Sequence, residues 1–403
     1  MKTEERFSAL WQSLAPIGRD PSSGGYVRYA FGPNDLACRE WFIEEALDRA
    51  LTVEPDGNGN LWAWWGDPHA GDAVVTGSHL DSVPHGGSFD GPLGIVSALL
   101  AVDLLREKGI EPRRPLGIAA FSEEEGSRFG VACLGSRLLT GAFPLDRVPA
   151  LVDRDGVSLS DAMTGADVDP ANLGPDPDRL QRLGVFVELH IEQGRALGAH
   201  TVGVASAIWP HGRWRLSFTG EGNHAGTTRM SDRHDPMLTY AYTVLAVNKE
   251  ARLARGHATI GRVAVEPNAT NAIADRVTAW LDVRAPDQST LDELVEAIRG
   301  RASERAGRDG TMVAMTTESV SPVTAFDPSL RDRLAGLLDG APVLPTGAGH
   351  DAGVLAAAGI PTAMLFVRNP TGVSHSPAEY ATDADCAAGV AALATVLEDL
   401  ACR

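Results

Sequence analysis

The sequence predicts an α/β protein with a mostly parallel sheet, helices on both faces of that sheet, and an inserted ferredoxin-like domain. Helical and strand patterns alternate from about residue 34 to 206, which is typical of a parallel sheet covered on both sides. The pattern changes between about 207 and 320 and returns after 321. The 403 residues also exceed what one hydrophobic core usually serves. We therefore expect one domain made of residues 1–206 and 321–403, and a second made of residues 207–320.

The first domain is expected to alternate helices with buried strands. Residues 34–51 have the pattern of an amphipathic helix, with Asn34 or Asp35 near its N-cap. A later helix is expected to end at Gly109 and to bury apolar residues at helical spacing, namely Ile95, Leu99, Val102 and Leu105. Apolar strands are predicted at 73–80, 115–122, 184–191 and 361–367, and further helices at 328–340 and 383–401.

The inserted segment has a different order of elements. Residues 211–220 alternate apolar and polar side chains, with Trp214, Leu216 and Phe218 on one face of a strand. The remaining predicted elements are a helix at 236–254, strands at 258–265 and 275–285, a helix at 289–306 and a strand at 311–320. That order is βαββαβ, the order of a ferredoxin-like unit.

Composition excludes several classes of partner. The formal net charge of -18 argues against nucleic acid and anionic membranes, which both need clustered Lys and Arg. The four cysteines are far apart and form no C-x-x-C pair, as expected for reduced thiols in the cytoplasm. The first residues lack the apolar run of a signal peptide, and no segment approaches membrane-spanning length. We expect a soluble, cytoplasmic protein.

The segment "GSHLDSVPHGGSFDGPLG", residues 77–94, places metal-binding side chains in a glycine-rich turn. His79 and Asp81 are two residues apart at the end of a predicted strand, so they share a face. The glycines that follow let the backbone bend and return Asp90 towards His79. The alternative is a hydrogen-bonded surface histidine beside a polar loop.

Three further candidates follow other predicted strands. Glu123, Glu124 and Glu125 come after the strand at 115–122. His190 lies in an apolar strand, and His375 follows the strand at 361–367. Each has an ordinary alternative, a solvated acidic run for the glutamates and a buried, hydrogen-bonded side chain for His190.

Taken together, the candidates point to a metal centre, because ligands in open α/β sheets gather at the carboxyl ends of strands. Three His, one Asp and one Glu without Cys suit Zn, Mn, Co or Ni. A carboxylate central in such a set can bridge two ions, which is the arrangement of two-metal hydrolases.

These residues and their spacing resemble the di-metal amidohydrolases related to aminoacylase and bacterial zinc carboxypeptidases. The match is to the branch that contains N-carbamoyl-L-amino-acid hydrolase, allantoate amidohydrolase and β-alanine synthase. The motifs occur in family order over nearly the whole chain, as "GSHLDSVPHGGSFDGPLG", "EEEGSRFG", "ELHIEQG", "HAGTT", "PNATNAIAD", "GAGHDA" and "SHSPAE".

The resemblance implies a role for each residue of the centre. Asp90 would bridge two divalent ions, Zn first and Mn, Co or Ni as alternatives. His79 and His190 would complete one site, and Glu125 and His375 the other. Glu124 would be the general base for a metal-bridged hydroxide, and Asp81 would orient His79.

The resemblance also assigns residues that bind a small, carboxylate-bearing substrate. The inserted domain would act as a lid and as the surface of a homodimer, from which His224 reaches the partner's site and stabilises the oxyanion. Asn271 and Arg284 would hold the substrate carboxylate, and the alternative for Arg284 is a salt bridge with Asp282. Further substrate contacts would come from Gln193, Gly347 and Gly349.

Three positions depart from the family pattern. Arg229 and Arg368 stand where proline is common, and His211 stands where glutamine is usual. One of these cations could meet a second acidic group on the substrate. The alternative is that they are ordinary exposed side chains.

The expected function is hydrolysis of a C–N bond in an N-carbamoyl or ureido acid, with allantoate or an N-carbamoyl-L-amino acid as leading substrates. One alternative is an N-formyl or N-acyl amino-acid hydrolase, or a dipeptidase, on the same scaffold. Another is a non-catalytic, ligand-binding dimer. The intact set of Glu124, Glu125 and the ligands argues against a non-catalytic dimer.

Overall fold

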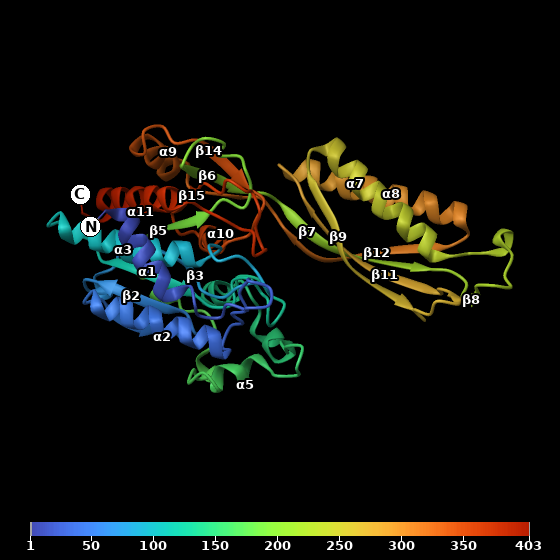
Figure 1. Ribbon diagram of the computed structural model, residues 1–403, viewed down its shortest axis with the longest axis horizontal. Coiled ribbons are helices and arrows are strands. Elements are labelled where there is room, and N and C mark those ends of the chain that lie inside the picture. Colours follow the sequence, from blue (N-terminus) through green and yellow to red (C-terminus); the bar gives the residue numbers. More distant parts are fainter. Residues whose placement is uncertain (1, 403) are drawn as a thin grey trace. The chain divides into compact units, whose positions relative to one another are not determined.

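The computed structural model describes residues 2–402 and divides the chain into two compact units (Figure 1). One unit comprises residues 1–207 and 325–403, and the other comprises residues 208–324. Among residues 2–402, no helix is both long enough and apolar enough to span a membrane. The roles of lid and dimerisation domain for the second unit stay predictions.

The first unit is built on a mixed sheet whose centre is parallel, in the order β1-β2-β4-β3-β5-β15-β6-β13, with β14 beside β6. Neighbours among β4, β3, β5 and β15 are parallel, whereas β1, β2 and β6 pair antiparallel. The bounds are β1 Thr52–Pro55, β2 Leu61–Trp65, β3 Ala73–His79, β4 Leu116–Phe121, β5 Leu183–Ile191, β6 Val202–Ile208, β13 Thr324–Ala325, β14 Val343–Thr346 and β15 Thr362–Val367.

Helices cover both faces of this sheet, as predicted. Along β5, Val187 and Leu189 pack into the core formed with α3 and α11. The side chain between them, Glu188, points to the opposite face, where its carboxylate accepts a hydrogen bond from the backbone N–H of Ala352 in α10. The helix bounds are α1 Thr3–Leu14, α2 Pro33–Asp48, α3 Pro92–Glu107, α4 Leu134–Thr140, α5 Leu159–Thr164, α6 Pro177–Arg182, α9 Pro328–Leu337, α10 Asp351–Ala357 and α11 Asp383–Leu397.

The helix α2 begins at Pro33, one residue before the predicted start, so Asn34 and Asp35 lie near its N-cap as expected. Its N-cap is Gly32, and Pro33 occupies the first helical turn, where its fixed φ suits the helix and its missing N–H costs nothing. Asp35 lies inside the helix, and its buried carboxylate accepts a hydrogen bond from the backbone N–H of Phe31. The predicted end of α3 is confirmed, because Gly109 follows the helix with φ +66°.

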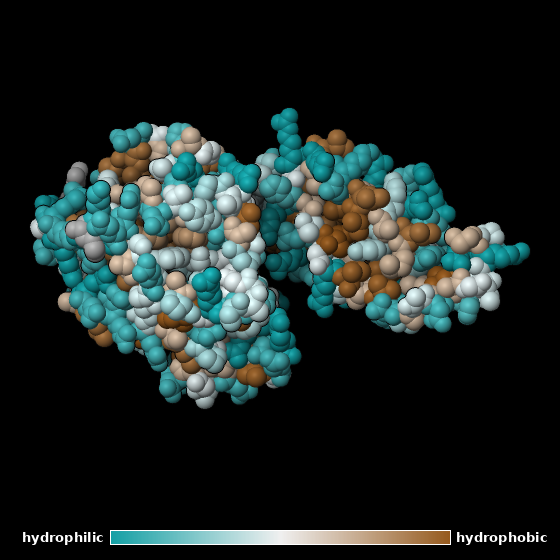
Figure 2. Space-filling model, in the orientation of Figure 1, coloured by the Kyte–Doolittle hydropathy of each residue, from teal (hydrophilic) through white to brown (hydrophobic). Residues whose placement is uncertain are grey.

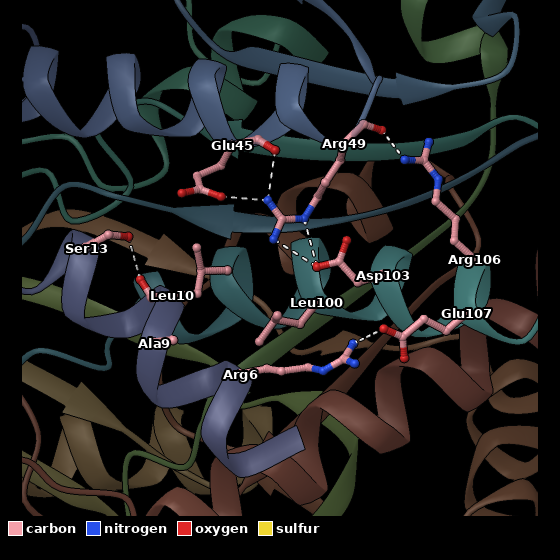
Figure 3. Close-up of a pocket in the computed structure, with 10 residues that line it drawn as sticks. All are labelled: Arg6, Ala9, Leu10, Ser13, Glu45, Arg49, Leu100, Asp103, Arg106 and Glu107. Atoms are coloured by element: carbon pink, nitrogen blue, oxygen red, sulfur yellow. Dashed lines mark hydrogen bonds and ion pairs between the residues drawn. The ribbon is translucent and has the colours of Figure 1, made fainter. Parts of the chain in front are cut away.

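Ion pairs fasten α1 and α2 to α3 around an open pocket of about 510 Å³ (Figure 3). Arg6 of α1 pairs with Glu107 of α3. Arg49, the C-cap of α2, pairs with Asp103 of α3 at 2.9 Å and with Glu45 at 2.7 Å. The Arg6–Glu107 and Arg49–Asp103 pairs of this pocket therefore link helices, whereas the pair with Glu45 lies within α2 and its C-cap.

The second unit is a four-stranded antiparallel sheet in the order β12-β7-β11-β9. Its helices α7 and α8 both lie on one side of the sheet (Figure 1). Trp214, Leu216 and Phe218 of β7 are buried in its core. The elements are β7 His211–Thr219, β8 Asn223–His224, α7 Pro236–Ala254, β9 His257–Glu266, β10 Ala272–Ile273, β11 Arg276–Arg284, α8 Gln288–Asp309 and β12 Met312–Ser321. Without the small β8–β10 pair, their order is βαββαβ.

Candidate metal centre

The five predicted ligands converge at the carboxyl ends of β3, β4, β5 and β15, with the carboxylate of Asp90 in the middle. Asp90 Oδ1 lies 3.2 Å from His190 Nε2 and 3.6 Å from His79 Nε2. Asp90 Oδ2 lies 3.4 Å from His375 Nε2, which is 3.5 Å from Glu125 Oε2. The two oxygens of Asp90 thus face two different groups of side chains, one with His79 and His190 and one with Glu125 and His375.

A glycine at the start of α3 makes this approach possible. Gly91 has φ +87°, and a Cβ built on it would lie 2.5 Å from the Nδ1 and Cε1 atoms of His79. No larger residue leaves room for the imidazole, and side chains rarely adopt that φ. The turn therefore returns Asp90 to His79 because position 91 is glycine.

The residues fit divalent cations. The Nε2 atoms of His79 and His190 are buried and have no hydrogen-bond partner among residues 2–402. Both point at Asp90, and their Nδ1 atoms face the backbone oxygens of Asp81 and Ile191 at 3.1 and 2.8 Å. Buried polar atoms without partners are costly, and imidazole nitrogens beside carboxylates are ligands for Zn and similar ions.

Burial and neighbouring charges shift the pKa values of the acidic and basic side chains in the cluster. Burial by itself would raise the pKa of Asp90, but the imidazoles of His190, His375 and His79 hold that pKa well below its usual value. The contact with Asp90 raises the pKa of His375 to about 9. Burial raises the pKa of Glu125 to about 7, and raises that of Glu124 well above the usual range.

Glu124 is held by contacts on both sides. Its Oε2 lies 3.7 Å from His79 Nε2, and its Oε1 accepts a hydrogen bond from the thiol of Cys133 at 3.3 Å. The backbone N–H groups of Glu124 and Glu125 both donate to the carboxylate of Asp81, at 3.2 and 3.1 Å. Asp81 therefore links the loop of His79 to the loop of the glutamates.

The predicted substrate contacts of the first unit lie at or near this cluster. Gln193 Nε2 donates to Asp90 Oδ2 at 2.8 Å and to Ser374 Oγ at 3.2 Å. Gly347 and Gly349 lie in the turn between β14 and α10, and Gly349 has no atom within 4 Å of a Cβ built on it. Their contact with substrate stays a prediction.

Two buried residues of the cluster, His350 and Glu379, had no predicted role. The ring of His350 lies 4.5 Å from that of His190, and its Nε2 has no partner among residues 2–402. Burial holds the pKa of His350 well below its usual value, which keeps the ring neutral. Glu379 accepts hydrogen bonds from the backbone of the Asp90 loop. His350 lies in the quoted motif "GAGHDA" and Glu379 in "SHSPAE", so these motifs carried a signal for both.

In the second unit, the predicted substrate residues lie at two separate places. His224 in β8 pairs with Ala272 in β10, directly after Asn271. The first residue of β11 pairs with Thr219, the last residue of β7 before β8. Arg284 is the last residue of β11 and therefore lies at the end away from β8. Nine residues of β11 separate these ends by roughly 26 Å at strand spacing. The alternative expected for Arg284, a pair with Asp282, is observed: its Nε donates a hydrogen bond to Asp282 Oδ1 at 2.9 Å.

The three positions that depart from the family pattern have structural partners. Arg229 has an 82% exposed side chain and pairs with Asp232 at 2.7 Å. Arg368 pairs with Asp385 in the first turn of α11 at 3.0 Å. His211 lies opposite Arg284 on the neighbouring strand, and burial lowers its pKa. These contacts favour ordinary structural roles for both arginines.

Comparison with known proteins decides the family. A family model described as "Peptidase family M20/M25/M40" matches residues 75–399. The chain belongs to this family. Members of the M20 family are metal-dependent hydrolases, in agreement with the ligand-rich cluster.

Several relatives of this M20 chain are named amidohydrolases. It is 36% identical to an N-carbamoyl-L-amino acid amidohydrolase of Geobacillus stearothermophilus, over 95% of this chain and 96% of the relative. It is 33% identical to an allantoate amidohydrolase of Escherichia coli, over 96% of both chains. The structure of a hydantoinase/carbamoylase-family amidase from Burkholderia vietnamiensis matches with a TM-score of 0.87 and 32% identity, over 99% of this chain and 98% of the other.

Proposed function

We propose that this M20 hydrolase is a two-metal amidohydrolase that cleaves a C–N bond of an N-carbamoyl or ureido acid. The observation that carries the proposal is the Asp90 carboxylate, whose two oxygens face two ligand groups. The names of the relatives supply the substrate class, N-carbamoyl-L-amino acids or allantoate.

His79, Asp90 and His190 would hold one ion, and Asp90, Glu125 and His375 the other. Zn fits this nitrogen and oxygen set best, with Mn, Co or Ni as alternatives. Bound divalent ions supply Lewis-acid polarisation of the scissile carbonyl and lower the pKa of a water molecule.

Glu124 is placed to act as the general base and acid. Its carboxylate lies beside the cluster without belonging to either ligand group, with Oε2 towards His79. Burial raises its pKa well above the usual value, so the carboxylate is a stronger base than an exposed glutamate. We propose that Glu124 takes a proton from the attacking water and passes it to the leaving nitrogen.

His224 has the geometry of an oxyanion donor. Its Nδ1 accepts hydrogen bonds from the backbone N–H groups of Gly226 and Thr227, at 3.0 and 3.1 Å. That arrangement leaves the proton of a neutral ring on Nε2, so the exposed edge of the imidazole is a donor. Asn271 beside it and Arg284 would bind the substrate carboxylate, and Gln193 would add a contact at Asp90.

The separation of these donors supports a homodimer. Arg284 ends β11, whereas His224 and Asn271 belong to the β8–β10 hairpin region beyond the other end of β11, so we propose that a complete site takes them from two chains. The second unit also has an apolar surface over α7 (Figure 2). The large exposed apolar residues of α7 are Met237, Leu238, Tyr242, Leu245 and Leu253. Beside α7, β9 is an edge strand of the sheet.

The dimer can be tested on this surface. Leu245→Glu places a charge on a side chain that is 71% exposed, and we expect it to shift the protein from dimer to monomer in light scattering. Leu47→Glu in α2 is a matched control, since Leu47 is 57% exposed in the first unit. A wild-type protein that is monomeric at all concentrations would contradict the proposal.

The cysteines support a cytoplasmic location, where thiols remain reduced. All four are free, and Cys38, Cys133 and Cys386 are buried. The proposed partners are a small carboxylate-bearing substrate and a second copy of the chain, without nucleic acid or membrane.

A substrate panel tests the function. Protein stripped by a chelator and reloaded with Zn, Mn, Co or Ni is assayed with allantoate and with the carbamoyl, formyl, acetyl and dipeptide forms of one L-amino acid. We expect turnover of the carbamoyl or ureido compounds after metal is restored, and turnover at least about 100-fold slower in Glu124→Gln prepared in parallel. Preference for the formyl, acetyl or dipeptide form would favour the alternative hydrolases, and binding without turnover would favour a ligand-binding dimer.

A further inference from the structure

The loop that carries Asp90 is fastened by a residue far away in the sequence. Glu379 is 4% exposed, and its Oε1 accepts hydrogen bonds from two consecutive backbone N–H groups. These are the N–H of Phe89 at 2.8 Å and the N–H of Asp90 at 3.0 Å. One carboxylate oxygen therefore fixes the peptide that precedes Asp90, and with it the direction in which the Asp90 side chain leaves the backbone.

The loop is shaped to receive this carboxylate. A Cβ built on Gly87 would lie 2.4 Å from Glu379 Oε1 and 2.5 Å from its Cβ. Gly87 does not have a positive φ, so its role at this point is close approach and not backbone conformation. The absence of a side chain at position 87 lets Glu379 reach the two N–H groups.

Aromatic rings hold the neighbouring side chain from two directions. The ring of Phe89 stacks on Trp11 of α1, with centroids 4.8 Å apart, and meets the edge of Tyr380 at 6.4 Å. Trp11 in turn stacks on Phe7 at 5.3 Å. Phe89 cannot turn without breaking these contacts, so the backbone bonds of Glu379 act on a loop whose side chain is already fixed.

The same segment also brings a ligand. His375 lies four residues before Glu379, and Ser374 Oγ donates to Asp90 Oδ2 at 3.1 Å. Residues 374–380 therefore contact Asp90 through its backbone, through its Oδ2 and through the imidazole that faces Oδ2.

We propose that Glu379 is a positioning residue for the metal centre, which sets the orientation of Asp90 and so the affinity of the site for divalent ions. Glu379 acts through Asp90, as residues behind metal ligands commonly do. The inference rests on the proposed function, because it requires that Asp90 binds metal.

The test measures metal binding, independent of catalysis. The dissociation constant for Zn²⁺ is determined on chelator-stripped, full-length protein by competition with a chromogenic chelator. Glu379→Ala leaves two buried N–H groups unpaired, and we expect Zn²⁺ affinity to fall about 10–100-fold. Glu379→Gln keeps an oxygen that can accept the same bonds, so its affinity should lie closer to wild type than to Glu379→Ala.

Two further variants make the result specific. Gly87→Ala displaces Glu379 without removing it, and we expect the same direction of change. Asp287→Ala is the matched control, because Asp287, the N-cap of α8 in the second unit, accepts a 2.8 Å hydrogen bond from the backbone N–H of Thr290 in a segment without predicted metal ligands. Its Zn²⁺ affinity should equal that of wild type. The visible absorption of bound Co²⁺ should change in Glu379→Ala and Gly87→Ala and remain unchanged in Asp287→Ala, since it reports ligand geometry.

The outcomes separate the two proposals. Wild-type Zn²⁺ affinity and Co²⁺ spectra in both Glu379→Ala and Gly87→Ala would overturn this inference alone, provided that Asp90→Asn binds Zn²⁺ weakly. Normal Zn²⁺ binding by Asp90→Asn would overturn the proposed centre and this inference with it. If Glu379→Ala does not fold, Gly87→Ala and Glu379→Gln give the same comparison.

Discussion

Two carboxylates of the centre differ in their proton affinity because their neighbours differ. Three imidazoles surround Asp90 and hold its pKa well below the usual value despite burial. Glu124 is buried beside other acids, and its pKa lies well above the usual value. A permanently ionised carboxylate suits a ligand, and a carboxylate that binds protons readily suits a general base. The environment of each residue, more than its type, thus supports the role that we propose for it.

Replacing Glu124 tests this division. We expect Glu124→Gln to lower kcat by about 10²–10⁴-fold, because the amide cannot accept the proton of water. KM and metal content should change little, since Glu124 belongs to neither ligand group. The neighbouring Glu125→Gln should instead reduce metal content, measured by atomic absorption. Retained turnover in Glu124→Gln would show that another group is the base.

Metal binding should depend on pH in a defined direction. The contact with Asp90 raises the pKa of His375 to about 9, and nearby carboxylates outweigh burial to raise those of His79 and His190. Without metal the ring of His375 carries a proton at neutral pH, and the rings of His79 and His190 bind protons more readily than usual. A bound cation must displace these protons. Zn²⁺ affinity should therefore rise as pH increases towards 9, with release of protons.

Calorimetry in two buffers of different ionisation enthalpy counts these protons. His375→Ala should release fewer protons than wild type at the same pH. A dissociation constant that does not change between pH 6 and pH 9 would contradict the expectation.

The two ends of α3 show how one residue type serves different purposes in one element. Gly91 begins the helix with φ +87°, and Gly109 follows its end with φ +66°. A Cβ at Gly91 would meet the ring of His79, whereas a Cβ at Gly109 would have no atom within 4 Å. Both positions need glycine for the backbone, but Gly91 also makes room for a ligand.

Alanine at each position separates these effects. Both Gly91→Ala and Gly109→Ala should lose about 1–2 kcal/mol of unfolding free energy, because positive φ is unfavourable for a side chain. We expect Gly91→Ala to lose more and to bind Zn²⁺ more weakly, since His79 must move. Gly109→Ala should bind Zn²⁺ as wild type does. Equal Zn²⁺ affinities, measured by chelator competition beside thermal unfolding, would contradict this account of the turn.

The sequence predicted the buried central strands of the large sheet but not its outer strands. The central strands β3, β4, β5 and β15 were predicted, because continuous apolar runs flanked by turn residues indicate burial on both faces. The strands β1, β2, β6, β13 and β14 were not. They are mostly short, and β2, "LWAWW", lacks the alternation that identifies a half-buried strand.

At the scale of the whole molecule, one chain does not gather every proposed substrate residue. His224 and Asn271 lie together at β8 and β10, while Arg284 lies at the far end of β11. The antiparallel register of β11 with β7 sets this separation. In the proposed dimer, a second chain would supply the missing set to each site, so dimer formation would be required for catalysis.

Mixed dimers test the shared site. Inactive His224→Ala chains combined with inactive Glu124→Gln chains should regain activity, because one of the two sites then has both residues. Up to half of the wild-type activity per mixed dimer is expected. Failure to recover, with subunit exchange shown by mass spectrometry of differently tagged chains, would refute a shared site.

The sequence by itself determined the kinds of ligand and the strands that carry them. His79, Glu125, His190 and His375 follow or end apolar strands, and such patterns are encoded within a few neighbouring residues. The parallel order of those strands then brings their carboxyl ends to one edge. This part of the centre was therefore open to prediction.

Only the tertiary structure decided which atoms meet. It showed that the oxygens of Asp90 face separate ligand groups, that His350 joins the cluster, and that Glu379 binds the backbone of Phe89, 290 residues away. It also separated Arg284 from His224. Such contacts depend on strand order, register and loop paths between distant segments, and local pattern carries no information about them.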